Sequence, residues 1–192
     1  MGRREEGFYW NNKCFWIFIL FVLGIILSYL QPLRLVEGGE ITYMSMLAIY
    51  LIGYFYGGKC GIMSALTFGI VQYFFHYPFI LNIPELWDYV LGYGLLGVGG
   101  FLSNKRQGIY KGYLLAVLLR YIESVLNCVY FYYMNDASLW ENIRYGLVYC
   151  GGYIGTETFL TLVVLCIPVI RECIEYIKYI ATNEYEDDLD SF

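Results

Sequence analysis

Charged residues are scarce in this sequence. Only 15% of its 192 residues are charged and 59% are hydrophobic, whereas a soluble domain usually carries about 25% charged residues. The chain is long enough for one domain, but it lacks the polar side chains that would cover such a domain in water. We therefore expect an all-α integral membrane protein with a single membrane domain.

Residue types that build catalytic and metal sites are also few or unfavourably spaced. His76 is the only histidine, and the six cysteines show no CxxC or other metal-like spacing, which favours cysteines buried as small apolar residues. The sequence has no phosphate-binding loop, Ser-His-Asp set or basic nucleic-acid patch. The glycines of "GYGLLGVGG" (92–100) lie in an apolar run, where they favour close helix packing. We expect no cofactor, no bound metal, no nucleic-acid partner and no enzymatic activity.

Apolar segments follow one another along the chain. A helix needs about 20 residues to cross roughly 30 Å of hydrocarbon, and several of the segments approach that length. They comprise residues 14–30, 41–56, 61–75, 86–102, 109–134 and 143–170. Only "GGKC" separates the second from the third, which predicts a tight turn. We expect residues 1–180 to form a bundle of six transmembrane helices and residues 181–192 to form an acidic, disordered tail.

Basic residues are distributed unevenly between the segments. In a six-helix zigzag, one side receives Arg3, Arg4, Lys13, Lys59, Lys105, Arg106, Lys111, Arg171 and Lys178, and the other side receives only Arg34 and Arg144. Loops rich in lysine and arginine stay in the cytoplasm. We therefore expect a multi-pass protein of the cell membrane with both termini in the cytoplasm.

Ionisable residues interrupt the apolar segments at a few positions. Asp88, Arg120, Glu123 and Glu157 fall at membrane depth, where charged side chains usually face a cavity or one another. Arg120 and Glu123 are three residues apart, so they can form an ion pair on one helix face or line a pocket. Asp88 can instead be an interfacial residue that reaches water. These possibilities stay open at the level of the sequence.

Aromatic residues are concentrated in the segments around these carboxylates. They include Tyr73, Tyr77, Trp87, Tyr89, Tyr130, Tyr132, Tyr133, Trp140, Tyr145, Tyr149 and Tyr153. Carboxylates beside ring faces suit a flat organic cation, which they attract by ion pairing and by cation–π contact. A membrane enzyme with acid–base carboxylates is one alternative, although no nucleophile or metal ligand accompanies them. An assembly subunit without a ligand is another.

Successive runs of the sequence resemble a known family. The runs are "GGEITYMSMLAIYLIGYFYGGKCGI" (38–62), "LWDYVLGYGLLGVGGFL" (86–102), "RYIESVLNCVYFY" (120–132) and "YGLVYCGGYIGTE" (145–157). In this order and spacing they resemble the thiamine-specific substrate-binding (S) components of energy-coupling factor (ECF) transporters, the ThiT/YuaJ family. The resemblance covers about residues 36–160.

The resemblance implies a membrane protein that binds thiamine or a related small heterocyclic cation at the outer face. Such a component docks on a transmembrane coupling protein and two ABC-type ATPases, which drive uptake of the ligand. Carried over position by position, the ligand-binding residues of the family fall on Asp88, Tyr89, Tyr132 and Tyr145.

Two positions depart from the family pattern. Ser124 stands where the family has a histidine, and Cys150 stands where it has an asparagine. Both family residues help to hold the aminopyrimidine end of thiamine, so their replacement removes hydrogen-bonding groups. Glu123, beside Ser124, can supply a different contact. The alternative function is therefore an ECF-type binder of another small molecule, such as a thiamine precursor or another vitamin.

Two small residues of the first segment, Gly24 and Ser28, are four apart and so share a helix face. Such spacing lets another helix approach closely. In the resembled family a small-residue face on this helix contacts the coupling protein, which implies docking through Gly24 and Ser28. Packing of this face against the protein's own helices is the alternative.

Overall fold

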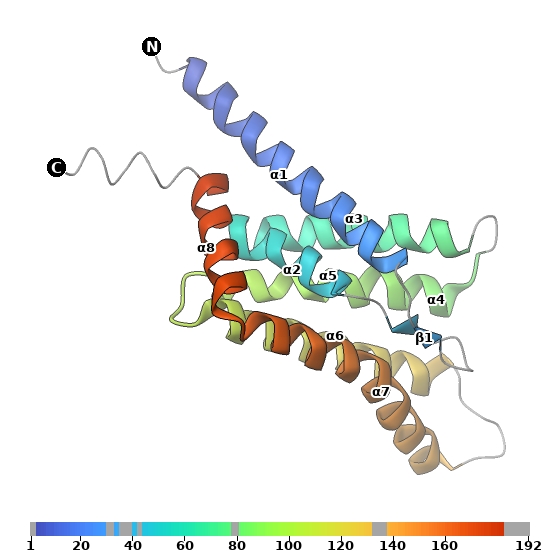
Figure 1. The fold of residues 1–192 in the computed structure, drawn as a ribbon. Helices are drawn as coiled ribbons and strands as arrows, with labels where there is room; N and C mark the ends of the chain where they lie inside the picture. Colours follow the sequence, from blue (N-terminus) through green and yellow to red (C-terminus); the bar gives the residue numbers. More distant parts are fainter. Residues whose placement is uncertain are drawn as a thin grey trace.

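The described residues form a bundle of helices with a short hairpin (Figure 1). The computed structural model describes residues 3–29, 33–34, 40–41, 44–77, 81–131 and 138–182. The long elements are α1 (Arg3–Tyr29), α2 (Ser45–Tyr56), α3 (Gly58–His76), α6 (Gly108–Phe131), α7 (Leu139–Leu165) and α8 (Pro168–Thr182). Strands β1 (Leu33–Arg34) and β2 (Glu40–Ile41) pair antiparallel, with Leu33 opposite Ile41. The described chain is thus helical almost throughout, as the sequence predicts.

The fourth apolar segment forms a helical rod whose hydrogen-bond pattern changes along its length. It begins with α4 (Ile83–Trp87), continues as a π-helical turn η1 (Asp88–Gly92), and then as α5 (Tyr93–Leu96) and the 3₁₀ segment η2 (Gly97–Leu102). The residues at the junctions keep right-handed helical angles, so the rod is continuous. A π turn accommodates one extra residue and is frequent at functional sites. Asp88 is the first residue of that turn.

Glycines allow α2, α3 and η2 to cross at very short distances. A Cβ atom added at Gly97 would lie 2.3 Å from the carbonyl carbon of Gly61, and one added at Gly100 would lie 2.4 Å from the carbonyl oxygen of Gly53. Any side chain at these positions would therefore collide with backbone. The packing role predicted for the glycine run is confirmed, and we call this contact of Gly53, Gly61, Gly97 and Gly100 the glycine crossing.

The helices lie close to the expected segments but begin or end at different residues. α2 begins at Ser45, not at 41, because Glu40 and Ile41 belong to the hairpin. The predicted tight turn after α2 is confirmed, since Gly57 alone separates α2 from α3 and has a positive φ of 86°. α1 extends from Arg3 rather than from 14, and α6 covers the expected fifth segment as far as Phe131. Residues 132–134, the expected end of that segment, lie outside the described residues.

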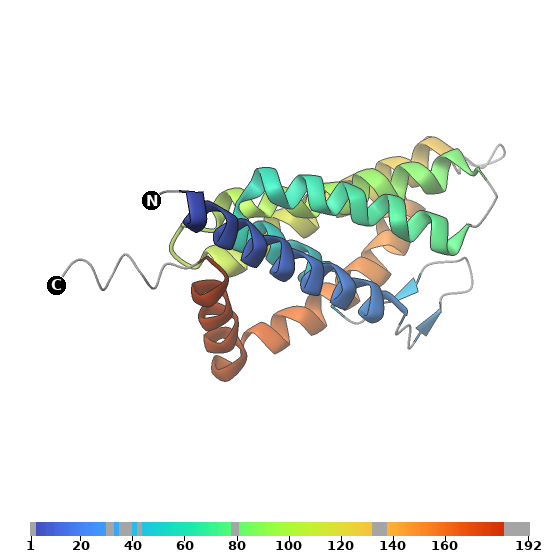
Figure 2. The ribbon, with the colours of Figure 1, turned by 90° about the horizontal axis from the view of Figure 1, so that it is seen from above.

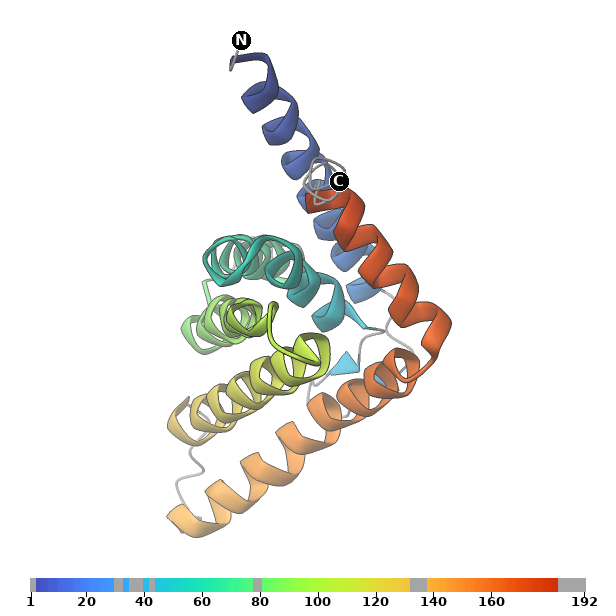
Figure 3. The same cartoon turned by 90° about the vertical axis from the view of Figure 1, so that its left-hand side faces the viewer.

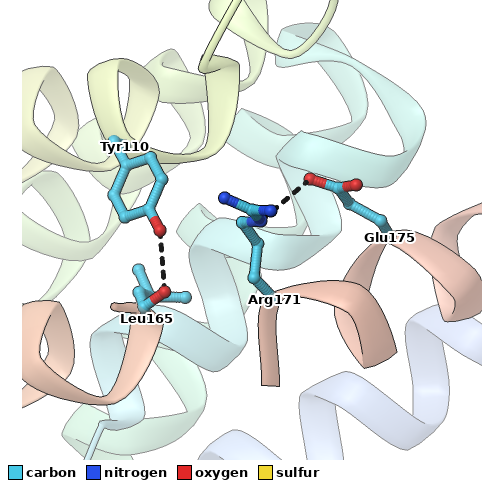
Figure 4. Close-up of polar contacts among 4 residues, drawn as sticks. All are labelled: Tyr110, Leu165, Arg171 and Glu175. Atoms are coloured by element: carbon cyan, nitrogen blue, oxygen red, sulfur yellow. Dashed lines mark hydrogen bonds and ion pairs between the residues drawn. The ribbon is translucent and has the colours of Figure 1, made fainter. Parts of the chain in front are cut away.

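The expected last helix, 143–170, is divided in two. α7 starts at Leu139 and ends at Leu165, and α8 starts at Pro168, whose ring nitrogen cannot donate a hydrogen bond to the preceding turn. Tyr110 of α6 donates its hydroxyl to the Leu165 carbonyl at 2.7 Å, which satisfies a carbonyl at the end of α7 (Figure 4). An ion pair of 3.8 Å joins Arg171 and Glu175 one turn into α8 (Figure 4).

α8 folds back across the bundle instead of continuing α7. It packs against α1, α2 and α7 (Figure 3). Tyr56 of α2 donates its hydroxyl to the Ala181 carbonyl at 3.2 Å, and Lys178 lies 4.4 Å from the centre of the Tyr54 ring. The helix continues to Thr182, so the first two residues of the expected tail are helical. Residues 183–192 lie outside the described part of the chain.

The connections gather at two opposite ends of the bundle (Figures 1 and 2). The start of α1, the α2–α3 turn, residues 103–107 and α8 lie at one end, which we call the basic end. It contains Lys59, Lys105, Arg106, Arg171 and Lys178. The hairpin and the starts of α4 and α7 lie at the opposite, hairpin end (Figures 1 and 2). The described basic turns thus share one end, as the zigzag predicts.

Some of the described helices have the length and composition of membrane spans. Gly108–Tyr130 and Leu139–Leu165 are long and apolar enough to cross a membrane, and Lys13–Tyr29 and Ser45–Tyr56 are shorter apolar helices. Large apolar side chains such as Phe18, Leu118 and Phe159 are at least half exposed. Exposed apolar surface of this kind suits a lipid environment.

Candidate ligand-binding site

Asp88 and Ser124 meet between the rod and α6. Ser124 is buried and donates its hydroxyl to Asp88 Oδ1 at 2.9 Å. Asp88 itself is half-buried. Its carboxylate is therefore held by a partner on another helix and is not simply an interfacial group in water. The structure brings together two residues that the sequence singled out on separate segments.

Arg120 and Glu123 share a helix but do not pair. The Arg120 guanidinium carbon lies 4.0 Å from the centre of the Tyr93 ring. Both Glu123 carboxylate oxygens are buried without a hydrogen-bond partner, and within the described chain no ion pair joins the two side chains. Gly92 of η1 lies beside both, since a Cβ there would be 3.0 Å from Glu123 Oε2 and 3.9 Å from Arg120 Cγ. Of the two possibilities that the sequence left open, the structure excludes the direct ion pair.

Glu157 of α7 holds the start of α2. Its carboxylate oxygen Oε1 accepts a hydrogen bond from the Met46 backbone N–H at 3.1 Å and another from the Ser45 hydroxyl at 3.3 Å. A carboxylate is favourable there because the first N–H groups of a helix lack partners and carry partial positive charge. Glu157 is only 4% exposed. Its described contacts are structural, and it ties α7 to the segment that follows the hairpin.

Acidic side chains outnumber basic ones in this part of the interior. Arg120 interacts electrostatically with Asp88, Glu157 and Glu123. Three acidic side chains thus interact with one guanidinium, and buried charges are costly unless they are paired. Among the described residues, no group of three histidine, cysteine or acidic side chains is arranged to hold a metal ion. The dispersed carboxylates fit an organic cation.

Tyrosines form two groups beside these charges. On one side Tyr73, Tyr77, Tyr89 and Tyr93 make ring contacts from α3 and the rod. On the other side Tyr145, Tyr149 and Tyr153 follow one another along α7, with the Tyr145 and Tyr149 rings stacked at 5.7 Å. Tyr153 interacts electrostatically with Asp88. The predicted residues Tyr89 and Tyr145 belong to these groups, whereas Tyr132 lies outside the described residues.

Asn127 is a polar residue of the same region that the sequence interpretation missed. It is 7% exposed, donates through Nδ2 to the Pro84 carbonyl at 3.2 Å, and leaves its Oδ1 buried without a partner. The signal was present in the spacing, because Arg120, Glu123 and Asn127 fall at intervals of three and four residues. Such positions share one helix face.

Similarity of the sequence to known proteins shows the family to which the chain belongs. A family model described as "Thiamine transporter protein (Thia_YuaJ)" matches residues 16–176. The chain belongs to this family of thiamine transporters. It is also 25% identical over 152 residues to the thiamine transporter ThiT of Bacillus subtilis (strain 168), which corresponds to 70% of this chain and 77% of that relative. The resemblance seen in the sequence is confirmed, and membership of a transporter family together with the apolar helices supports a membrane location and a role in transport rather than in catalysis.

Ser124 and Cys150, the two positions at which the resemblance implies a departure from the family, have different structural settings. Ser124 uses its hydroxyl to hold Asp88. Cys150 is 2% exposed, and its thiol interacts with that of Cys128 across the α6–α7 interface. Neither cysteine forms a disulfide. Ser124 therefore belongs to the charged region directly, whereas Cys150 packs two helices beside it.

The small-residue face of α1 is turned inward in this Thia_YuaJ protein. A Cβ at Gly24 would lie 3.0 Å from Ile49 Cδ1 and 3.1 Å from Phe68 Cε2. Ser28 is 2% exposed and accepts a hydrogen bond from Gln72 Nε2 at 2.5 Å. In the structure α2 and α3 pack against this face, which agrees with the alternative of internal packing, and docking through Gly24 and Ser28 stays a prediction. Docking through Gly24 and Ser28 would require α1 to separate from these helices.

Proposed function

We propose that this protein is the substrate-binding (S) component of an ECF-type importer and binds thiamine or a closely related heterocyclic cation. The observation that carries the proposal is the excess of carboxylates around Arg120, flanked by two groups of tyrosines. Asp88 would form the ion pair with the ligand, and Tyr89 and Tyr145 would supply ring faces. Family membership supports thiamine as the first candidate.

The orientation in the membrane follows from the distribution of charge. The basic end would face the cytoplasm, because lysine- and arginine-rich turns stay on that side. Ligand would then enter from the hairpin end, towards which α4 and η1 place Asp88 (Figure 1). Coupling to a transmembrane partner and two ABC-type ATPases rests on the resemblance to ECF components.

Binding of a different small molecule is the second candidate. The observation that favours it is the hydrogen bond from the Ser124 hydroxyl to Asp88. The resemblance places a ligand-binding histidine at this position, whereas the serine hydroxyl is already bonded to Asp88. A thiamine precursor would satisfy the same excess of carboxylates. Native mass spectrometry of the gently purified protein would identify a ligand that co-purifies, and a mass other than that of thiamine would favour this candidate.

A titration of the purified protein with thiamine tests the first candidate. Trp87 precedes Asp88 and is 52% exposed, so its fluorescence should change when ligand binds. We expect saturable binding in the wild-type protein and a loss of about 1–3 kcal/mol in Asp88→Asn, the usual scale for a charged hydrogen-bond partner. Glu172→Gln, the same chemical change on an exposed position of α8, is the matched control and should bind normally. Equal affinities for all three proteins would remove Asp88 from the site.

A further inference from the structure

Three neighbouring side chains of α6 have buried polar atoms without partners. Arg120, Glu123 and Asn127 are 9%, 8% and 7% exposed. The atoms without a hydrogen bond are Nε and Nη1 of Arg120, both carboxylate oxygens of Glu123, and Oδ1 of Asn127. Nearly all buried polar groups in proteins have a partner, so a concentration of unpartnered atoms calls for a physical explanation.

The described residues of the chain do not supply the missing partners. Arg120 lies against the Tyr93 ring rather than on Glu123, which leaves two donors on one side chain and two acceptors on the other. Asn127 is oriented by its bond to the Pro84 carbonyl, which only the Nδ2 end can make. Its Oδ1 is therefore fixed as an acceptor. The face of α6 that carries these three residues therefore offers acceptors at Glu123 and Asn127 and donors at Arg120.

The three residues can reach one bound molecule. Positions 120, 123 and 127 succeed one another at helical spacing, which places their Cβ atoms about 5–6 Å apart from one residue to the next. Gly92 of η1 lies against Glu123 and Arg120 and contributes no side chain between them. Asp88, which starts the same π turn, interacts electrostatically with both. The face therefore adjoins the carboxylate assigned to the ligand cation.

We propose that Glu123, Asn127 and Arg120 form a polar subsite that recognises the amino-bearing edge of a heterocyclic ligand. The Glu123 carboxylate and the Asn127 Oδ1 accept hydrogen bonds from the amino group, and the Arg120 guanidinium donates to the neighbouring ring nitrogen. This inference rests on the proposed function and specifies the part of the ligand that Asp88 does not bind. An aminopyrimidine has such an edge.

This arrangement of acceptors and donors should distinguish an amino ligand from the corresponding oxo ligand, and the ratio of the two binding affinities measures the distinction. Replacement of the amino group by an oxo group exchanges a donor for an acceptor and places a proton on the adjacent ring nitrogen. The oxo oxygen, an acceptor, would then face the acceptors of Glu123 and Asn127. The protonated ring nitrogen, a donor, would face the donor of Arg120. Sites built to hydrogen-bond one group discriminate strongly against an analogue that leaves buried polar groups unpaired.

The test compares thiamine with its 4-oxo analogue, oxythiamine, on the same purified full-length protein. Wild-type protein should bind thiamine about 10- to 100-fold more tightly than oxythiamine. In Glu123→Gln the side chain has the same shape but can both donate and accept, so the ratio of the two affinities should fall by about tenfold. Glu172→Gln should keep the wild-type ratio. A ratio measured on one preparation does not depend on the fraction of folded protein.

The outcomes separate this inference from the proposed function. If wild-type protein binds thiamine, Asp88→Asn weakens binding and Glu123→Gln leaves the amino-to-oxo ratio unchanged, the subsite is overturned and the proposed function stands. A change in melting temperature without a change in the ratio has the same meaning, because Glu123 would then have a structural role with Arg120. If wild-type protein binds neither compound, thiamine fails as the ligand of the proposed function, and this inference fails with it.

Discussion

At the scale of the residue, a hydroxyl on another helix holds the Asp88 carboxylate. Ser124 donates to Asp88 Oδ1 across the contact between η1 and α6. A hydroxyl that orients a carboxylate before the ligand arrives reduces the cost of ordering the site on binding. The resemblance aligns this serine with a ligand-binding histidine, whereas in the structure its hydroxyl holds an acidic residue.

Removal of that hydroxyl should therefore weaken binding without removing any charge. We expect Ser124→Ala to lower the affinity for thiamine by about tenfold, on the scale of one hydrogen bond to a charged group. Isothermal titration calorimetry of the purified protein measures the change. Ser103→Ala, the same substitution in the turn at the basic end, serves as control. Unchanged affinity in Ser124→Ala would show that the hydrogen bond does not orient Asp88 for binding.

At the scale of the element, the rod 83–102 contributes both to stability and to the site. Its second half contains two glycines of the glycine crossing, and its first half contains Asp88. The crossing fixes the rod against α2 and α3, so the position of the carboxylate depends on contacts formed further along the same element. The glycine run predicted this packing, but periodicity gave no indication of the π turn, because an extra residue leaves an apolar run apolar.

Gly97→Ala should destabilise the protein through backbone contacts. The added Cβ would lie 2.2 Å from the Ile62 nitrogen, and overpacking of this kind costs about 1–3 kcal/mol or more. Thermal unfolding in detergent should show a lower melting temperature. Gly152→Ala on α7, where no atom lies within 4 Å of an added Cβ, should not lower it. A Gly97→Ala protein as stable as the wild type would contradict the close crossing.

At the scale of the whole molecule, the sequence predicted the type of fold better than the partners of individual side chains. Hydropathy located most of the helices but not the break between α7 and α8. Asp88 and Ser124 were singled out from separate runs before the fold brought them together. Pro168 was visible in the sequence, but the apolar run around it outweighed its effect on the helix. Asn127 was missed because a single asparagine in an apolar segment does not indicate a site unless it is known to share a helix face with Arg120 and Glu123. The inward orientation of Gly24 and Ser28 depends on which helices pack together, which spacing does not determine.

The covered face of α1 gives a prediction for transport. We expect the double substitution Gly24→Leu with Ser28→Leu to lower both thermal stability and thiamine binding, because leucine at 24 collides with Ile49 and Phe68 and the Ser28–Gln72 bond is lost. Uptake in cells and binding by the isolated protein are measured together. Phe18→Leu on the exposed side of α1 (66% exposed) is the control. Loss of uptake with intact binding would instead favour docking through this face.

The π turn at Asp88–Gly92 has a consequence for helical phase. Successive α-helical residues advance by about 100° around the axis, so one extra residue rotates everything after it by that amount relative to everything before it. A helical wheel drawn through 86–102 with a constant angle therefore assigns one half of the rod to the wrong side. Asp88 and the glycine crossing have their present directions only because the turn lies between them. Loss of a single residue within 88–92 would rotate the carboxylate away from Ser124 while both halves of the rod stayed helical.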